Sequence, residues 1–179
     1  MKVLLNCYTP FALAHGGAQV QIEQTQKALK AAGVEVDPLR WWDAGQNADI
    51  IHHFGRMPAE HIHLAQQKGI KVVTAELLTA TGSRSPAQLR IQKIISRGIE
   101  NFAPRSFVTA YNWDSYRLAD ACIALTPWEA HLMNYLFGAP KERIHVVPNG
   151  VEEIFLNAPK VTRGQWLVCT CLLYTSRCV

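Results

Sequence analysis

The amino-acid sequence predicts an α/β domain in which a parallel sheet carries helices on both of its faces. Short apolar runs of strand length alternate along the chain with longer segments of helical periodicity. The clearest stretch, residues 119–151, contains a strand, a capped helix and a second strand in succession. Because parallel strands need a crossover connection, which is usually a helix, this alternation predicts βαβ units and a parallel sheet.

Composition and charge are those of an ordinary globular protein. The chain has 179 residues, of which 49% are hydrophobic and 18% are charged, which is enough for one substantial core. The net charge of +4 comes from scattered basic residues, so no nucleic-acid partner is expected. No apolar run approaches the ~20 residues of a membrane helix, and the first residues lack the features of a signal peptide, so we expect a cytoplasmic protein.

Six strands and five helices are predicted in order before residue 151. The strands cover residues 2–7, 34–39, 48–55, 70–75, 121–125 and 144–147, four helices begin near residues 18, 58, 86 and 127, and a further helix runs into Ala119. Gly33 and Gly69 end the first two helices, at 32 and 68, by the rule that glycine often follows a helix. Pro38 lacks a backbone donor, so its strand is expected at an edge of the sheet.

The helix inside residues 119–151 has clear predicted boundaries. Thr126 can cap the helix, Pro127 suits its first position, and Glu129 stands where a capping box needs a carboxylate. Gly138 follows the last helical residues and can adopt the left-handed conformation that closes many helices.

The helix that begins at Ser85-Pro86 is amphipathic and basic. Its apolar face is predicted to contain Ile91, Ile94, Ile95 and Gly98, and its basic stripe to contain Arg90, Lys93 and Arg97. A basic amphipathic helix can bind an anionic membrane surface, so residues 86–100 are candidates for a weak peripheral membrane contact. The simpler interpretation is that the basic stripe is the solvated face of a core-packed helix.

Several motifs of residues 119–151 follow one another in a characteristic order. The segment begins with an Ala-Asp pair, an apolar strand and Thr-x-x-Glu. It continues with a helix ending in Phe-Gly, a Pro/Lys/Glu turn, Ile-His-Val-Val and Pro-Asn-Gly-Val. This order resembles the end of the N-terminal domain of family 4 glycosyltransferases of the GT-B fold. Residues 48–54 resemble a second signature of that family. The resemblance implies a Rossmann-like domain that is the N-terminal half of a GT-B fold.

The resemblance also implies an activity. Such enzymes transfer a sugar from a nucleotide-diphosphate sugar to an acceptor hydroxyl with retention of configuration, as hexosyltransferases that require no metal and no further cofactor. The acceptor would be a glycan, a lipid-linked molecule or a small molecule. Some members of the family are peripheral membrane proteins, so a location at the inner face of the membrane is a further expectation.

Two glycines and two histidines are candidates for the ligand cleft. Gly16 and Gly17 precede the first helix, where backbone N–H groups and the helix dipole favour an anion. In the family, a Gly-Gly pair at this point lies beside the donor diphosphate. His52 and His53 fall at the end of the third strand, where open α/β sheets bind ligands, and His52 is a candidate for proton exchange.

Glu76 follows the fourth strand, where many family members have a histidine that contacts the donor. A carboxylate would repel a diphosphate, so that role is not transferred to Glu76. Its alternatives are binding of acceptor hydroxyls or an ion pair with Arg84, and Glu76 and His52 are the two catalytic candidates. Asn149 and Gly150, in the Pro-Asn-Gly-Val run, complete the predicted cleft residues.

The family pattern predicts three regions. Residues 1–150 would be the acceptor-side domain, residues 151–170 a linker and the start of a donor-binding domain, and residues 171–179 a tail that resembles a translated sequencing adapter. Because the family's donor-binding residues lie in the second domain, we expect this fragment to be inactive and its full-length parent to be an enzyme. Two alternatives remain open: a non-catalytic Rossmann-like binding domain, and a GT-B nucleotide-sugar epimerase that uses Glu76 as acid and base.

The cysteines indicate neither a disulfide framework nor a metal site. Three of the five, Cys169, Cys171 and Cys178, lie close to the end of the chain. No Cys/His quartet with the spacing of zinc ligands is present in the sequence, so no metal is expected.

Overall fold

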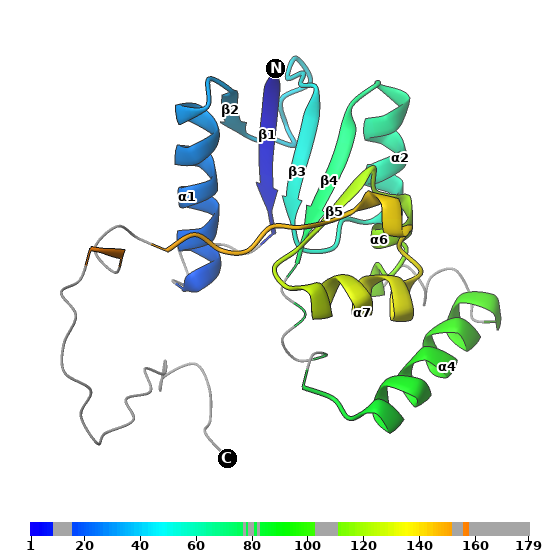
Figure 1. The fold of residues 1–179 in the computed structure, drawn as a ribbon. Helices are drawn as coiled ribbons and strands as arrows, with labels where there is room; N and C mark the ends of the chain where they lie inside the picture. Colours follow the sequence, from blue (N-terminus) through cyan, green and yellow to red (C-terminus); the bar gives the residue numbers. More distant parts are fainter. Residues whose placement is uncertain are drawn as a thin grey trace. The chain divides into compact units, whose positions relative to one another are not determined.

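The computed structural model describes residues 1–8, 16–76, 78, 81, 83–102, 111–151 and 156–157. The chain divides into two compact units, Met1–Asn149 and Gly150–Val179. Every helix and strand named below belongs to the first unit (Figure 1). Of the predicted regions 151–170 and 171–179, residues 152–155 and 158–179 lie outside the described residues.

The first unit contains one six-stranded sheet in which all neighbouring strands are parallel (Figure 1). The strands are β1 Lys2–Cys7, β2 Glu35–Pro38, β3 Ile50–Phe54, β4 Lys71–Ala75, β5 Ala121–Ala124 and β6 Ile144–Val146. They lie in the order β2-β1-β3-β4-β5-β6. All six predicted strands are confirmed, and β2 lies at an edge, as Pro38 predicts.

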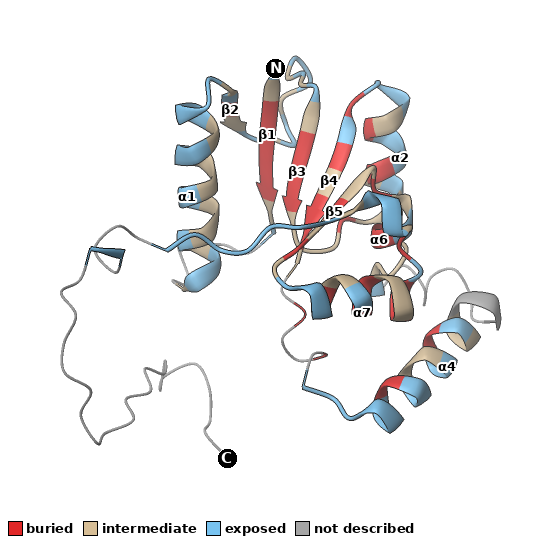
Figure 2. Ribbon diagram, in the orientation of Figure 1, coloured by how far each residue is buried: buried red, intermediate tan, exposed pale blue. Residues whose placement is uncertain are grey.

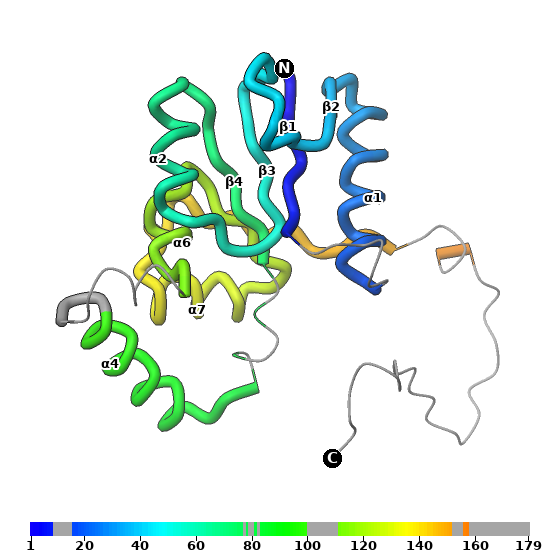
Figure 3. The backbone as a smooth tube through the Cα atoms, turned by 180° about the vertical axis from the view of Figure 1, so that it is seen from behind, coloured from blue at the N-terminus to red at the C-terminus, as the bar shows by residue number. Residues whose placement is uncertain are grey.

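Helices connect these strands. They are α1 Gly17–Ala31, α2 Ala59–Gln67, α4 Pro86–Phe102, α6 Ser115–Leu118, α7 Pro127–Phe137 and the 3-10 turn η1 Lys141–Arg143. The view from behind shows α1 beside β1 and β2, and α2 beside β4 (Figure 3). The predicted βαβ connections are therefore present.

The core has a layer on each face of the sheet. On one face, Leu4, Ile51 and Val72 pack with the buried Ile62 and Ala65 of α2. On the other face, β1 and β2 pack against α1 through Val3, Leu5, Val36, Ile22 and Leu29. Successive residues of a strand point to opposite faces, which explains why neighbouring β1 residues belong to different layers. Helices on both faces confirm the predicted α/β class.

Helix α7 begins and ends where the sequence predicts. The Thr126 hydroxyl accepts a hydrogen bond from the Glu129 N–H (3.1 Å), and Gly138 adopts a left-handed conformation (φ 69°). The Glu129 carboxylate, however, does not close a capping box. Its two oxygens accept from the backbone N–H groups of Leu78 (3.1 Å) and Leu125 (2.9 Å). This buried carboxylate therefore joins α7 to the loops after β4 and β5.

The reciprocal capping box forms instead at the start of α4. The Ser85 hydroxyl accepts from the Gln88 N–H (3.4 Å), and the Gln88 side chain accepts from the Ser85 N–H (2.9 Å). Both partners satisfy backbone donors that no helical carbonyl can reach. The predicted helix start at Ser85-Pro86 is confirmed.

The isoleucine face of α4 is turned towards solvent, and Figure 2 shows exposed residues along the length of this helix. Ile91, Ile94 and Ile95 have exposed fractions of 58%, 72% and 52%. The helix packs against α7 through another side, where Leu89 and Ser96 are buried and the Lys93 ammonium lies 3.8 Å from the ring centre of Tyr135. The predicted basic stripe is therefore divided, because Lys93 packs on α7. In the part of the chain that the structure describes, no helix has both the length and the apolar character required to span a bilayer.

Candidate functional site

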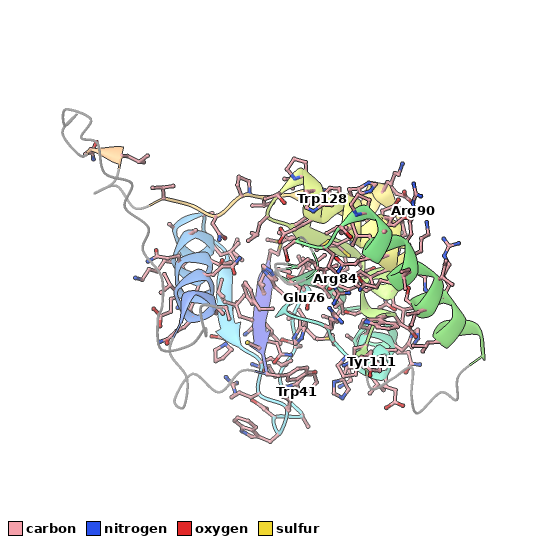
Figure 4. All side chains as sticks on the ribbon, turned by 90° about the horizontal axis from the view of Figure 1, so that it is seen from below. Trp41, Glu76, Arg84, Arg90, Tyr111 and Trp128 are labelled. Atoms are coloured by element: carbon pink, nitrogen blue, oxygen red, sulfur yellow. The ribbon has the colours of Figure 1, made fainter. Side chains whose placement is uncertain are left out.

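The strand order reverses at β1, and this reversal locates the ligand edge of the sheet. The chain passes from β1 to β2 on one side and then returns to β3 on the other side. Open α/β sheets bind ligands beyond the carboxyl ends of their strands at such a point. A cavity of about 180 Å³ lies at this edge. Figure 4 views the molecule from the side of the carboxyl ends of the strands, with Glu76 near the centre.

The cavity has an apolar wall and one acidic side chain. Its described lining residues come from the ends of β1, β3, β4 and β5 and from α1, and are Cys7, Ala18, Gln21, Phe54, Gly55, Ala75, Glu76, Ile123 and Leu125. Glu76 is the charged member of this set. Convergence of four strand ends and a helix on one small cavity is typical of a binding site.

Glu76 belongs to a closed polar network with Arg56 and Tyr116. The Arg56 Nε donates to Glu76 Oε2 (2.8 Å) and to the Tyr116 hydroxyl (3.2 Å), and this hydroxyl donates to the same carboxylate oxygen. The Arg56 guanidinium also lies over the rings of Tyr116 (5.7 Å) and Phe137 (5.3 Å). We call Arg56, Glu76 and Tyr116 the closed network. The predicted pairing of Glu76 with Arg84 is wrong, since Arg84 donates to Gln92.

The environment of Glu76 has opposing effects on its charge. Burial raises the pKa of the carboxyl above its usual range, and the hydrogen bond and charge of Arg56 offset this shift in part. The two side chains of the ion pair are 25% and 22% exposed for Arg56 and Glu76. Glu76 is therefore a carboxyl group at the border of the cavity whose position is fixed by hydrogen bonds to Arg56 and Tyr116.

His52 and His53 point to opposite faces of the sheet, because they are consecutive strand residues. His52 stacks on Phe54 with ring centres 4.4 Å apart, and the Nδ1 of His53 accepts from the Asn6 side chain (2.8 Å). Burial lowers the pKa of each histidine to about 4, so both rings are neutral at pH 7. Neither is among the residues that line the cavity, and their role in ligand binding stays a prediction.

The two glycines lie where helix α1 begins. Gly16 is the residue before the helix and Gly17 is its first residue. Among the described residues, no heavy atom lies within 4 Å of a Cβ atom added at either glycine. Ala18, the next residue of α1, and Gln21, about one turn further along, line the cavity. The role of the glycines beside a donor diphosphate stays a prediction.

The three remaining predicted cleft residues are all exposed. Arg84 is exposed in the segment before α4. Asn149 ends the first compact unit and Gly150 begins the second, and both are exposed. Their contribution to a cleft also stays a prediction.

Sequence reasoning missed Arg56 and Tyr116. Arg56 comes directly after Gly55 at the end of β3, at the edge where ligands bind, and this position was the available signal. Tyr116 lies on the short helix α6, and nothing in the local sequence connects it to Glu76, 40 residues earlier. Only the packing of α6 against α2 and α7 brings the two side chains together.

A parallel α/β sheet with a cavity at its point of reversal defines a Rossmann-like ligand-binding domain. The model of Glycosyltransferase Family 4 matches residues 37–153, which are 117 of the 179 residues. The chain therefore belongs to Glycosyltransferase Family 4, and this membership supports glycosyltransferase activity with a sugar donor and an acceptor. No curated protein matches the chain. The matched region contains the closed network and strands β3 to β6, whereas Gly16 and Gly17 precede it.

Proposed function

We propose that this domain is the acceptor-side half of a retaining glycosyltransferase that uses a nucleotide-diphosphate sugar. The observation that carries the proposal is the family match over residues 37–153, on a fold with a cavity at the carboxyl edge of its sheet. In the reaction, the acceptor hydroxyl oxygen forms a bond to the anomeric carbon, and the bond from this carbon to the diphosphate breaks. The hydroxyl proton leaves with the diphosphate or passes to solvent.

Positioning and electrostatics would supply most of the catalysis. The start of α1, a helix of 15 residues, presents backbone N–H groups beside Gly16 and Gly17, where no atom of the described residues would meet an added Cβ atom. A developing diphosphate charge is stabilised by such an arrangement. We propose that Gly16 and Gly17 approach the donor diphosphate, that Asn149 and Gly150 border the same cleft, and that no metal is required.

Glu76 would act by orienting the acceptor. It borders the cavity, and Arg56 and Tyr116 fix one of its carboxylate oxygens. A fixed carboxylate can accept a hydrogen bond from an acceptor hydroxyl without moving, which favours a single orientation. His52 is the weaker catalytic candidate, because it is buried beside Phe54 and its pKa of about 4 leaves no proton to donate at neutral pH.

We propose that activity requires a second domain after residue 150. In this proposal residues 151–170 begin that domain, residues 171–179 are not part of it, and the 179-residue chain alone does not transfer sugar. Two alternatives compete. A non-catalytic binding domain would bind a ligand and turn nothing over, and a nucleotide-sugar epimerase would need Glu76 as a free acid or base, which its two partners disfavour.

Helix α4 supports a finer proposal on location, a peripheral contact with the inner face of the membrane. Its three isoleucines are exposed, and Arg90 and Arg97 stand about one helical turn before and after Ile94. Exposed apolar residues next to arginines are the pattern of interfacial helices on anionic lipid. An enzyme held in this way could reach a lipid-linked acceptor.

The experiment is a donor screen on the protein encoded by a reading frame that continues beyond Val151. Release of nucleoside diphosphate from a panel of nucleotide sugars, with and without acceptors, would identify the donor. Glu76→Gln should lower acceptor-dependent turnover at least tenfold, and Glu60→Gln, which changes an exposed carboxylate, should not. Sugar transfer by residues 1–168 alone would contradict the proposal that a second domain is required. Absence of transfer with every donor would contradict the enzyme assignment.

A further inference from the structure

Three rings form a cluster at the carboxyl edge that the proposed site does not use. Tyr8 follows β1, Trp41 follows β2 by a few residues, and His61 lies in the first turn of α2. The rings of Tyr8 and Trp41 are near parallel, with planes 23° apart and centres 6.4 Å apart. Trp41 and His61 have ring centres 4.7 Å apart, and the Tyr8 hydroxyl lies 3.1 Å from His61 Nδ1. We call these three residues the ring platform.

The ring platform is open on one side. Tyr8 is 48% exposed and Trp41 is 49% exposed. Figure 4 shows Trp41 on the opposite side of Glu76 from Trp128, so the platform is separate from the start of α7. Large aromatic rings that are half buried and half exposed at a ligand edge indicate a binding surface, because their apolar faces gain free energy when a ligand covers them.

The loop that carries Trp41 is held in place by its own hydrogen bonds. The Arg40 N–H donates to the Gln46 side chain (2.8 Å), which in turn donates to the Pro38 carbonyl (2.9 Å). Within the same loop, the Arg40 guanidinium binds the Asp43 carboxylate (2.8 Å). Trp41 is thus fixed before any ligand arrives, which reduces the entropy that binding must remove.

The surroundings of the ring platform are close to electrically neutral. The charges of Arg40 and Asp43 compensate each other. Beneath Tyr8 lies the ring of His53 (ring centres 4.7 Å apart), which is buried and accepts a hydrogen bond from Asn6. The loop that carries Trp41 offers a phosphate or carboxylate ligand no unpaired arginine, because Arg40 is paired with Asp43, so the platform favours an uncharged ligand.

We infer that the ring platform binds an uncharged sugar ring of the acceptor. A pyranose has an apolar C–H face that can stack on Tyr8 and Trp41, and hydroxyl groups at its rim that can bond to the Tyr8 hydroxyl and the His61 ring. This inference rests on the proposed function, in which an acceptor approaches the same edge of the sheet. It assigns the acceptor to the carbohydrates or glycoconjugates.

The test uses the 179-residue chain and the methyl glycosides of glucose, mannose, galactose and N-acetylglucosamine, with uridine and adenosine for comparison. Binding is measured by saturation-transfer NMR and by the shifts of the tryptophan indole N–H signals. Trp41→Ala should weaken glycoside binding roughly tenfold. Trp42→Ala is the matched control, because Trp42 is the adjacent tryptophan and is 82% exposed. This substitution should leave glycoside binding unchanged.

The outcomes separate the possibilities. A glycoside-dependent shift of the Trp41 indole signal in the wild-type chain supports the inference, even where Trp41→Ala proves too unstable to measure. Binding of nucleosides alone, no glycoside binding, or equal losses in the two tryptophan variants would overturn it. If the longer enzyme carrying Trp41→Ala transfers sugar with an unchanged acceptor KM, the platform is refuted and the proposed function stands. Glycoside binding without any transfer would support the platform and refute the proposed function.

Discussion

The closed network and the ring platform lie at the same edge of the sheet, yet they differ in how many of their groups have hydrogen-bond or packing partners within the protein. Arg56, Glu76 and Tyr116 satisfy one another and are largely covered. Tyr8 and Trp41 keep about half of their surface exposed, and the loop that carries Trp41 is fixed by other hydrogen bonds. A satisfied cluster stabilises the fold and holds Glu76 in one position, whereas an open and fixed cluster leaves its ring faces available to a ligand.

The largest expected effect comes from breaking the closed network at its cation. Arg56→Met leaves the Glu76 carboxylate partly buried without its ion-pair partner, which should lower the free energy of unfolding by about 3 kcal/mol. Urea unfolding followed by circular dichroism would measure it. Arg84→Met, at an exposed arginine, should change stability by less than about 0.5 kcal/mol. If the two substitutions lower the free energy of unfolding equally, the closed network contributes no more to stability than an exposed surface residue does.

The buried histidines should make the fold sensitive to mild acid. Their pKa values of about 4 lie below the usual 6.5, so the unfolded state binds more protons between these values. Stability is therefore complete above pH 6.5 and falls as the pH falls towards 4, by about 2 kcal/mol per histidine between pH 7 and 5. Glu76, whose pKa is raised, acts in the opposite direction.

Urea midpoints at pH 7 and pH 5 would measure this loss. His52→Gln should remove about half of it, and His145→Gln, at an exposed histidine, should leave it unchanged. If the free energy of unfolding does not change between pH 7 and pH 5, His52 and His53 are not buried in the neutral form.

The exposed face of α4 extends the comparison to a second open surface. Ile94→Ser removes the most exposed of the three isoleucines and should weaken binding to anionic phospholipid vesicles roughly tenfold. Vesicle sedimentation would measure it, with Val20→Ser on α1 as the control, because that valine is an exposed apolar residue (50%) on another helix. If the wild-type chain binds neutral vesicles as strongly as anionic vesicles, the proposed electrostatic contact is ruled out.

The smallest effects come from two matched hydroxyl deletions. Tyr116→Phe removes the hydroxyl that bridges Arg56 and Glu76 and should cost about 1–2 kcal/mol of stability. Tyr8→Phe removes an exposed hydroxyl that contacts His61, and should cost less than about 0.5 kcal/mol while it weakens glycoside binding. The reverse order of stabilities would contradict the account of which cluster is closed.

Local signals were sufficient to predict most of the fold. Thr126, Gly138 and Ser85 determine helix ends through contacts within a few residues, and Pro38 identifies the edge strand through its missing donor. Such features depend on the neighbouring chain, so a sequence alone can reveal them. The opposite orientation of His52 and His53 also follows from strand geometry alone.

The candidate site was less predictable, because it depends on tertiary contacts. Glu76 was identified from its place after β4, but its partners Arg56 and Tyr116 come from 20 residues before it and 40 residues after it. The direction of the α4 isoleucines likewise depends on how the helix packs on α7. Periodicity identifies an apolar face, but it does not determine whether that face is covered.

The most direct test of the central claim is the stereochemistry of the product. The longer protein, which contains this domain and the proposed second domain, would be incubated with its donor and a glycoside acceptor. Proton NMR at early times would then measure the coupling constant of the anomeric proton at the new glycosidic bond. The account predicts a glycoside whose anomeric configuration matches that of the donor sugar. An inverted product, an epimerised donor without a new glycosidic bond, or no reaction with any donor would contradict it.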